Sequence, residues 1–329
     1  MIEVSHLTKR YGNHTAVSDL SFRIEKGQIY GFLGPNGAGK STTMNIMTGC
    51  LAPTSGDVKI GGFDIFEQAA QAKKLVGYLP ELPPLYPDRT PREYLRFVAE
   101  AKGIPAAQRK EQIEHVIQVT QIEDVANRLI KNLSKGYKQR VGIAQALLGD
   151  PEIIILDEPT VGLDPKQIIE IRDLIQELGK DHTVILSSHI LSEVQAVCQT
   201  IMIISKGKLV ACDTPENLEK LFAGTTTVRL KAESDLDGIR EILSQLPFIT
   251  EITEDAADDH YTTVRIDTNS ADSDAVCKDI FFAFCDARCA VLQLSMEKAS
   301  LEDIFIELTS DAAAETAAQP EDTDQEVAE

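Results

Sequence analysis

Apolar residues follow different periods in different parts of the chain, and the change of period divides it into regions. Short apolar runs bounded by turn residues occur at 29–33, 153–156, 183–187 and 201–204, and most of the stretches between them are long enough for helices. Strands that alternate with helices indicate an α/β fold with a mainly parallel sheet. The first region is therefore predicted to contain such a sheet.

The segment 91–150 has a helical period instead. Leu95, Val98 and Ala99 share one face of a predicted helix, and a second apolar helix face follows at 113–117. We therefore expect a helical subdomain at about 82–150, inserted into the α/β core.

Beyond residue 222 the predicted elements become shorter. In chain order they are a strand at 226–231, a helix at 236–246, strands at 249–253 and 261–267, a helix at 271–287, a strand at 290–294 and a last helix at 301–309. The order β-α-β-β-α-β predicts a small α+β ferredoxin-like domain at 224–310. Residues 311–329 contain seven acidic residues and neither a basic nor an aromatic residue, which predicts a disordered acidic tail.

Charge separates the same regions. The net charge is −20, and the part from Gly224 onward holds 25 acidic and 7 basic residues against 27 and 25 in the first 223. This asymmetry indicates a boundary near Gly224 and argues against nucleic acid as the ligand of the C-terminal part. The six cysteines have neither zinc-site nor disulfide-framework spacing, which fits a reducing cytoplasm. The apolar stretches are far shorter than the ~20 residues that span a bilayer.

A glycine-rich segment follows the apolar run 29–33 and matches the pattern G-x-x-x-x-G-K-[ST]. Its backbone N–H groups and the helix that follows form a nest for phosphates. Lys40 is expected to contact the β- and γ-phosphates, Ser41 to bind Mg²⁺, and Thr42 to reach the α-phosphate side. The predicted nucleotide contacts are Gly34, Pro35, Asn36, Gly37, Ala38, Gly39, Lys40, Ser41 and Thr42.

Two acidic residues end the apolar run 153–156, so they are expected at the carboxyl edge of the sheet beside the phosphates. Asp157 would hold Mg²⁺ through its water shell, and Glu158 would polarise the attacking water as a general base. His189, about 30 residues further on at another strand end, is placed to contact the γ-phosphate and that water. Glu158 and His189 are therefore the candidate catalytic residues.

Three further segments complete a fixed order along the chain: YLPE at 78–81, LSKGY at 133–137 and SSH at 187–189. With the glycine loop and the segment 153–159, they make region 1–223 similar to an ATP-binding-cassette (ABC) ATPase. The resemblance implies ATP and Mg²⁺ as ligands, with adenine stacked on Tyr11 beside Val17. It also implies that Ser134 and Gly136 close the nucleotide site of a second copy. The tight turn at 162–164 would cross the dimer interface, where Asp164 helps to shape the opposite site.

The sequence departs from the family pattern at three positions. Lys135 and Tyr137 stand in a segment that is usually Leu-Ser-Gly-Gly-Gln, and Glu81 stands where the family usually has glutamine. Ser134 remains a good N-cap for the helix that follows, and a carboxylate at Glu81 can still coordinate Mg²⁺. The segments that carry these variants, together with the segment 300–309, resemble those of cassettes from drug, lipid, polysaccharide and gliding-motility exporters.

The resemblance implies an ATP-hydrolysing transporter subunit, peripheral on the cytoplasmic face of the membrane. Two copies, expected to form a homodimer, would enclose two MgATP head to tail and drive a separate transmembrane permease. A soluble ABC protein acting on ribosomes or nucleic acid is disfavoured, because such proteins generally need two cassettes or long insertions, and only about 90 residues separate Lys40 from Ser134. A regulatory role for 224–309 stays open. Asp258, Asp259 and His260 could form a metal cluster, but we interpret them as a polar turn between strands.

Overall fold

The computed structural model describes residues 1–222, 226–257, 260–270, 273–297 and Phe305. They belong to two compact units, which divide between Thr214 and Pro215, whereas charge alone suggested a boundary near Gly224. The predicted tail at 311–329, nearly all of the predicted helix 301–309, and the pair Asp258–Asp259 lie outside the described residues. Among the residues that the structure describes, no helix combines the length and apolar character needed to cross a membrane.

A six-stranded sheet forms the centre of the first unit and is parallel except at one edge. In spatial order its strands are β10 (Lys208–Asp213), β9 (Thr200–Ser205), β3 (Ile29–Leu33), β8 (Thr183–Ser188), β7 (Ile153–Leu156) and β6 (Val76–Leu79). Only β10 runs antiparallel to its neighbour. Every residue of β3, β7 and β8 is buried, which explains the uninterrupted apolar runs in the sequence. The predicted α/β fold with a mainly parallel sheet is confirmed.

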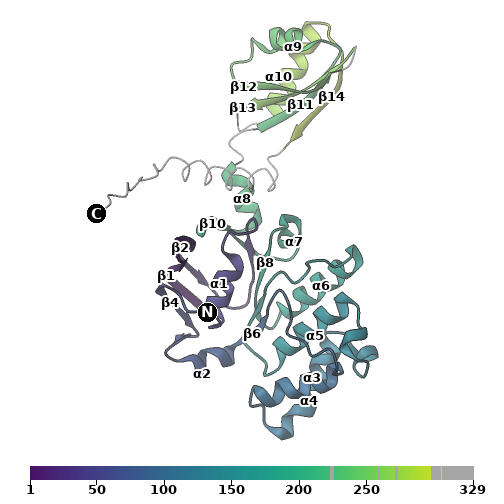
Figure 1. Ribbon diagram of the computed structural model, residues 1–329. Coiled ribbons are helices and arrows are strands. Elements are labelled where there is room, and N and C mark those ends of the chain that lie inside the picture. The colour runs from purple at the N-terminus through teal and green to yellow at the C-terminus, as the bar shows by residue number, and fades with distance from the viewer. Residues whose placement is uncertain (223–225, 258–259, 271–272, 298–304, 306–329) are drawn as a thin grey trace, which may run out of the picture. The chain divides into compact units, whose positions relative to one another are not determined.

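A smaller antiparallel sheet covers one side of this centre. Its strands in spatial order are β2 (His14–Ile24), β1 (Ile2–Tyr11), β4 (Ser55–Ile60) and β5 (Phe63–Asp64). Helix α1 (Lys40–Met47) lies between the two sheets in Figure 1, and Met44 and Met47 are buried in the same core cluster as Val4 of β1 and Phe32 of β3. This packing holds the first turn of α1 at the carboxyl end of β3.

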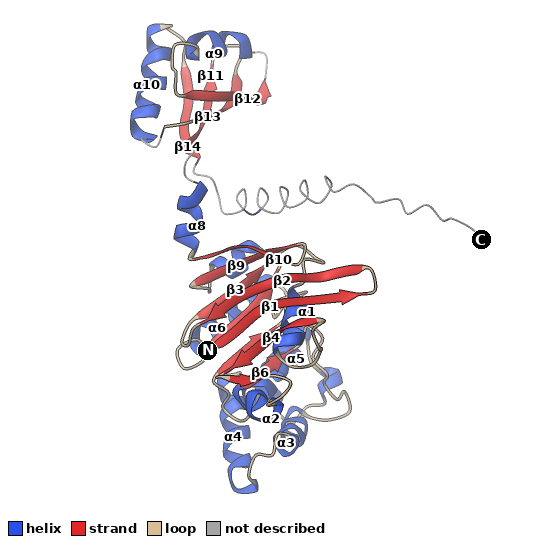
Figure 2. Ribbon diagram, turned by 90° about the vertical axis from the view of Figure 1, so that its left-hand side faces the viewer, coloured by secondary structure: helices blue, strands red, loops and turns tan. Residues whose placement is uncertain are grey.

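Helices collect beyond the β6 edge of the central sheet (Figures 1 and 2). They include α3 (Pro91–Ala101), α4 (Ala106–Val119) and α5 (Lys135–Leu147), with short 3₁₀ turns at Glu123–Val125 and Ile130–Asn132. Thr90 and Glu93 form a reciprocal capping box that begins α3. Elsewhere in the unit are α2 (Ala69–Ala72), a 3₁₀ turn at Lys73–Leu75, α6 (Pro165–Leu178) and α7 (Leu191–Gln195).

The second unit begins with α8 (Pro215–Phe222) and continues in the predicted order β-α-β-β-α-β. Its elements are β11 (Thr226–Ala232), α9 (Leu236–Leu243), β12 (Ile249–Ala257), β13 (Thr262–Thr268), α10 (Ser273–Asp286) and β14 (Val291–Glu297). The strands form an antiparallel sheet in the order β12-β13-β11-β14, and both helices cover one face of it (Figure 2). Its assignment to the ferredoxin-like class stays a prediction.

We predict that Phe284→Ala destabilises the second unit by about 3–5 kcal/mol, the usual cost of removing a buried phenyl ring. Phe284 lies on α10, is fully buried and belongs to the core cluster beneath the sheet. Denaturant unfolding of the full chain, followed by circular dichroism, measures the loss.

Phe281→Ala on the same helix is the matched control, because this ring is about half exposed. It should cost less than about 1 kcal/mol. Equal effects of the two substitutions would contradict the packing described for α10.

Candidate functional site

A cavity of about 570 Å³ lies where the glycine loop meets the carboxyl ends of the central strands. Segments far apart in the sequence converge on it: the loop itself, the strand β1, the segment after β6, and the ends of β7 and β8. Its lining consists of Tyr11, His14, Ala16, Asn36, Gly37, Ala38, Gly39, Lys40, Ser41, Thr42, Glu81, Glu158, Val161 and His189. Most of the residues predicted to contact a nucleotide therefore surround one space.

The glycine loop runs close to the backbone of its neighbours, and two of its glycines are required by that contact. Gly39, the N-cap of α1, has φ 102°, and a Cβ there would lie 2.5 Å from the carbonyl oxygen of Ala16. A Cβ on Gly34 would collide with the carbonyl oxygen of Ile204 on β9. Since no side chain caps α1, its first N–H groups are available to an anion in the cavity.

Lys40 places a positive charge at the same helix end. Its side chain is buried, and its ammonium group donates to the carbonyl oxygens of Gly34 at 2.7 Å and Pro35 at 3.3 Å. It also lies 3.5 Å from Oε1 of Glu158. Gly34 and Pro35 therefore do not line the cavity but hold the lysine that does.

Asp157 connects the glycine loop to the central sheet. One of its oxygens, Oδ1, accepts hydrogen bonds from the hydroxyls of Ser41 at 3.1 Å and Ser187 at 2.6 Å. Serine hydroxyls and carboxylates are the hard oxygen ligands that Mg²⁺ prefers, and Glu81 faces the same cavity. The residues Ser41, Asp157 and Glu81 therefore fit the predicted magnesium site in their chemistry.

Glu81 follows β6, whose end is fixed by two hydrogen bonds between Tyr78 and neighbouring helices. The Tyr78 hydroxyl donates to Oδ1 of Asn45 on α1 at 3.1 Å, and the Gln145 amide donates to the Tyr78 carbonyl at 2.7 Å. Burial, and after it the negative charge of Asp157, raises the pKa of the Tyr78 phenol. The phenol thus stays a neutral donor that ties β6 to α1.

Glu158 and His189 are brought together as a pair. Nδ1 of His189 lies 3.0 Å from Oε2 of Glu158. The Glu158 side chain is 8% exposed and the His189 side chain 38% exposed, and both line the cavity. Glu158 has φ 48°, a strained value for a glutamate, and its backbone N–H donates to the Ser187 hydroxyl at 2.8 Å. The carboxylate is thereby turned toward the ammonium group and the imidazole.

The predicted adenine contacts are placed differently from one another. Tyr11 is about half exposed, lines the cavity and has the Lys9 ammonium 5.2 Å from its ring centre. Val17 is fully buried in the core and does not line the cavity, whereas its neighbour Ala16 does. The pairing of β1 with β2 shifts between Lys9–Val17 and Arg10–Thr15, so Ala16 is left as the extra residue of a bulge. At this bulge the residue that lines the cavity is therefore Ala16, and not the predicted Val17.

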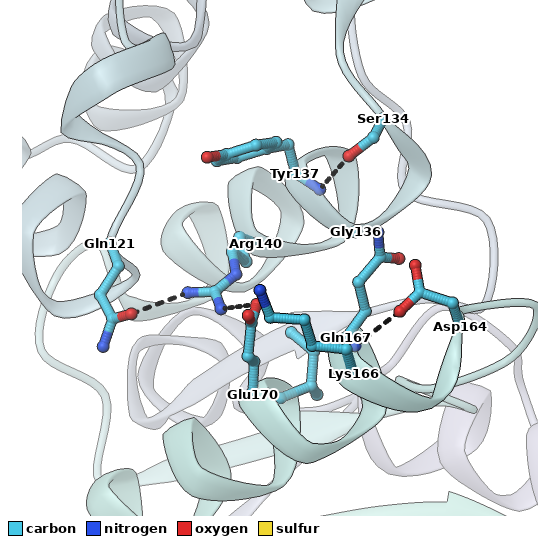
Figure 3. Close-up of a pocket in the computed structure, with 10 residues that line it drawn as sticks. Gln121, Ser134, Gly136, Tyr137, Arg140, Asp164, Lys166, Gln167 and Glu170 are labelled. Atoms are coloured by element: carbon cyan, nitrogen blue, oxygen red, sulfur yellow. Dashed lines mark hydrogen bonds and ion pairs between the residues drawn. The ribbon is translucent and has the colours of Figure 1, made fainter.

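A second cavity of about 400 Å³ holds the remaining predicted residues (Figure 3). Ser134 begins α5 and accepts a hydrogen bond from the Tyr137 N–H at 3.3 Å, while Asp164 begins α6 and accepts one from the Gln167 N–H at 2.9 Å. Gly136 lies between these two helix starts, where a Cβ would meet the Gln167 side chain. Ser134, Gly136 and Asp164 therefore gather in one place, but it is not the cavity of the glycine loop.

The two unusual residues of the segment 133–137 make contacts of their own. The Tyr137 hydroxyl donates to Asp124 at 2.8 Å, and this hydrogen bond, with a smaller contribution from burial, raises the pKa of the phenol. The Lys135 ammonium group lies over Gly162, where any Cβ would collide with it. Tyr137 thus attaches the start of α5 to the turn at Asp124, and Lys135 lies against the loop at Gly162.

Sequence reasoning missed a buried polar cluster behind the first cavity. Glu193 on α7 accepts hydrogen bonds from the hydroxyls of Thr160 and Ser188. All three residues are buried. Neither a motif nor a spacing singles them out, because they meet only through the fold.

The fold and the first cavity together define the class of protein. A buried parallel strand, a glycine loop, an α-helix with a lysine at its start and an acidic pair at the end of β7, which β8 separates from β3 in the same sheet, make a P-loop nucleoside-triphosphate-binding domain. Residues 17–161 match the sequence profile of the ABC transporter family.

Relatives extend the similarity along the chain. The linearmycin resistance ATP-binding protein LnrL of Bacillus subtilis (strain 168) is 31% identical over 310 residues, which are 94% of this chain and 98% of the relative. The bacitracin transport ATP-binding protein BcrA of Bacillus licheniformis is 42% identical over 211 residues, 64% of this chain and 68% of the relative. The match to LnrL therefore reaches into the second unit.

The fold agrees with a solved dimer, the post-hydrolysis state of the ATP-binding cassette MJ0796 bound to ADP and Pi. That structure is 26% identical, has a TM-score of 0.59, and the match covers 65% of this chain and 98% of that one. The chain belongs to the ABC transporter family, as an ATP-binding subunit.

We predict that Gly39→Ala weakens ATP binding at least about 10-fold, equivalent to about 1.4 kcal/mol. An alanine at position 39 would be strained at the positive φ of Gly39, and its methyl group would lie too close to the Ala16 carbonyl oxygen. The loop and the start of α1 would therefore have to shift. Equilibrium dialysis with labelled ATP measures the dissociation constant.

Gly103→Ala is the matched control, since Gly103 also has positive φ but has open space around it and lies outside this cavity. Its dissociation constant should stay within about twofold of the wild-type value. A Gly39→Ala protein that binds ATP like the wild type would contradict the loop geometry.

Proposed function

We propose that this chain is the ATP-hydrolysing subunit of an ABC exporter, in which two copies bind two MgATP head to tail and drive a separate permease. The observation that carries the proposal is the division of the predicted nucleotide contacts between two cavities of one chain. The cavity of the glycine loop is lined by Lys40, Glu158 and His189, and the other by Ser134 and Asp164. A second copy facing the first in the opposite direction would bring one cavity of each kind to each nucleotide.

The start of α5 is suited to contact a phosphate held by the other copy. Ser134 accepts its capping hydrogen bond through Oγ, so its hydroxyl hydrogen remains free for an acceptor outside the helix. The helix N-terminus adds a partial positive charge at the same point. The solved dimer of the similar cassette MJ0796 supports an arrangement of two copies.

In the proposed reaction a water molecule attacks the γ-phosphorus while the bond to the β–γ bridging oxygen breaks, leaving ADP and inorganic phosphate. Glu158 accepts the proton of the attacking water, and His189, held 3.0 Å from Glu158, contacts the γ-phosphate and the water. Lys40 and the first N–H groups of α1 neutralise phosphate charge. A magnesium ion held by Ser41 and Asp157, with Glu81 beside it, would supply further charge neutralisation.

A surface next to Glu81 offers a place for the permease. Leu82 is 82% exposed, and the rings of Tyr86 and Phe97, each about half exposed, lie 5.3 Å apart. Exposed apolar residues in such a group mark interaction surfaces. Because Glu81 lines the nucleotide cavity and Leu82 follows it directly, a permease segment on this surface would move with the nucleotide site.

Export and location are the finer parts of the proposal. The relatives named for bacitracin transport and linearmycin resistance support an exporter of a compound harmful to the cell. Binding to a permease would keep the chain at the cytoplasmic face of the membrane. We propose residues 1–223 as the ATP-binding domain, with its helical subdomain at about 82–150, residues 224–310 as an accessory domain, and 311–329 as an acidic tail.

Glu158→Gln should abolish ATP turnover and trap a dimer in the presence of MgATP. The amide cannot accept the proton of the attacking water, but it preserves the size of the side chain, so binding and closure remain. Size-exclusion chromatography with light scattering, with and without MgATP, measures the dimer, and phosphate release measures turnover.

The double variant Glu158→Gln/Ser134→Arg tests the head-to-tail contact itself. An arginine at Ser134 would fill the place of the phosphate from the other copy, so this protein should bind ATP as a monomer and form no dimer. A Glu158→Gln protein that stays monomeric with MgATP and its permease present, or a double variant that still dimerises, would exclude the sandwich.

Affinity capture from detergent-solubilised cells should recover a polytopic membrane protein in near-equal amount to the tagged chain. The variant Tyr86→Glu/Phe97→Glu should lose this partner while binding ATP normally, because the charges disrupt the exposed aromatic pair outside the nucleotide cavity. Quantitative mass spectrometry compares the two captures. Recovery of ribosomal proteins in place of a membrane protein would overturn the transport role and leave the ATPase chemistry intact.

A further inference from the structure

We propose that Glu193 is a positioning residue for ATP hydrolysis, which holds Glu158 and His189 in the arrangement that the reaction needs. The inference rests on the proposed function, because it concerns the same reaction. Glu193 itself does not line the cavity. It acts through the residues beside the candidate catalytic pair.

The Glu193 carboxylate joins the two loops that carry this pair. Its Oε2 accepts a hydrogen bond from Thr160 Oγ1 at 2.5 Å and another from Ser188 Oγ at 3.1 Å. Thr160 is two residues beyond Glu158, and Ser188 immediately precedes His189. One oxygen atom therefore fixes the distance between the loop of Glu158 and the loop of His189.

The hydrogen bonds at Ser188 also fix the backbone on both sides of His189. A carboxylate only accepts hydrogen bonds, so the Ser188 hydroxyl must donate to it and keeps its lone pairs for another donor. That donor is the backbone N–H of Ile190, at 3.1 Å. Ser188 and Ile190 are thus held to each other, with His189 between them, and the imidazole faces Glu158.

Burial makes these contacts obligatory. Thr160, Ser188 and Glu193 are each no more than 5% exposed, so water cannot replace a lost partner without entering the interior. Among the described residues no lysine, arginine or histidine forms an ion pair with Glu193. A buried carboxylate held by two hydroxyls is costly to maintain, and a packing role alone would be served better by an apolar side chain.

The helix that carries Glu193 is itself anchored to the central sheet. Its neighbour Val194 is fully buried and lies against Gly31 of β3, where a Cβ would collide with the valine side chain. The glycine allows α7 to approach the sheet closely enough for Glu193 to reach Thr160. The strand that leads into the glycine loop therefore also sets the position of Glu193.

The segment that starts at Thr160 gives this contact a second consequence. It ends at Asp164 in the other cavity, and the Leu163 N–H donates to the Thr160 carbonyl at 3.2 Å within it. If a second copy displaced Asp164, Thr160 would move with it. Because Thr160 is hydrogen-bonded to Glu193, the loop of His189 would be displaced as well. Glu193 is placed to make hydrolysis respond to the second copy.

The test compares Glu193→Met, which removes the acceptor at similar volume, with Glu193→Gln, which retains an oxygen acceptor. We expect Glu193→Met to lower kcat about 10- to 100-fold, as a displaced catalytic pair does, with the KM for ATP changed less than about threefold. Glu193→Gln should restore kcat to within about fivefold of the wild-type value. Gln195→Met, an exposed position on the same helix, is the control for methionine on α7 and should leave both constants unchanged.

Ser188→Ala and Thr160→Val provide an independent test if Glu193→Met does not fold. Each removes one hydroxyl donor, should lower kcat by a smaller factor than Glu193→Met, and should add little to it in the double variant, because all three act through one contact.

The proposal is overturned if these variants keep kcat within about twofold of wild type, if kcat falls only together with ATP affinity, or if Glu193→Gln is as slow as Glu193→Met. Failure of the proposed function is a separate outcome. It shows in the wild-type protein, as an absence of ATP hydrolysis, whereas failure of this proposal shows only in variants of an active wild-type protein.

Discussion

Asp157 Oδ1 joins the parts of the molecule that must meet at the nucleotide. It accepts hydrogen bonds from Ser41 at the start of α1 and from Ser187 on β8, and it lies at the end of β7. Three elements that share no local sequence are thereby brought within hydrogen-bonding distance of one atom. The continuous burial of β3, β7 and β8 makes this possible, because strands packed on both faces keep their ends in register. The glycine loop, the acidic pair and His189 all take their positions from this edge.

The fold of the first unit could be predicted because its signals are local. The apolar runs identify the buried strands, and the glycine loop requires a strand before it and a helix after it. The acidic pair at 157–158 was located by the strand that precedes it. In each case the sequence segment contains both the residue and the element that positions it. The structure places the glycine loop from Asn36 to Thr42 and Glu158 around one cavity, with Asp157 hydrogen-bonded to Ser41 beside it.

The predictions were incomplete where position depends on contacts between distant segments. The resemblance to ABC cassettes implies Val17 as the apolar neighbour of Tyr11, but a bulge in β2 opposite β1 leaves Ala16, and not Val17, at the cavity. Glu193 belongs to no recognisable pattern, and its role becomes visible only when α7 is packed against Gly31. Bulges and helix packing depend on tertiary contacts, which cannot be predicted from the local pattern of a single sequence.

The separation of Ser134 from the glycine loop has a consequence for how much ATP the cell uses. Under the proposed head-to-tail arrangement an isolated copy binds ATP without the groups that complete the site, so it would hydrolyse ATP only very slowly. The rate per molecule then depends on how often two copies meet, and it rises with their concentration. A permease that holds two copies side by side raises their effective concentration to the millimolar range. Under the proposed arrangement, ATP hydrolysis would thereby be confined to the assembled transporter.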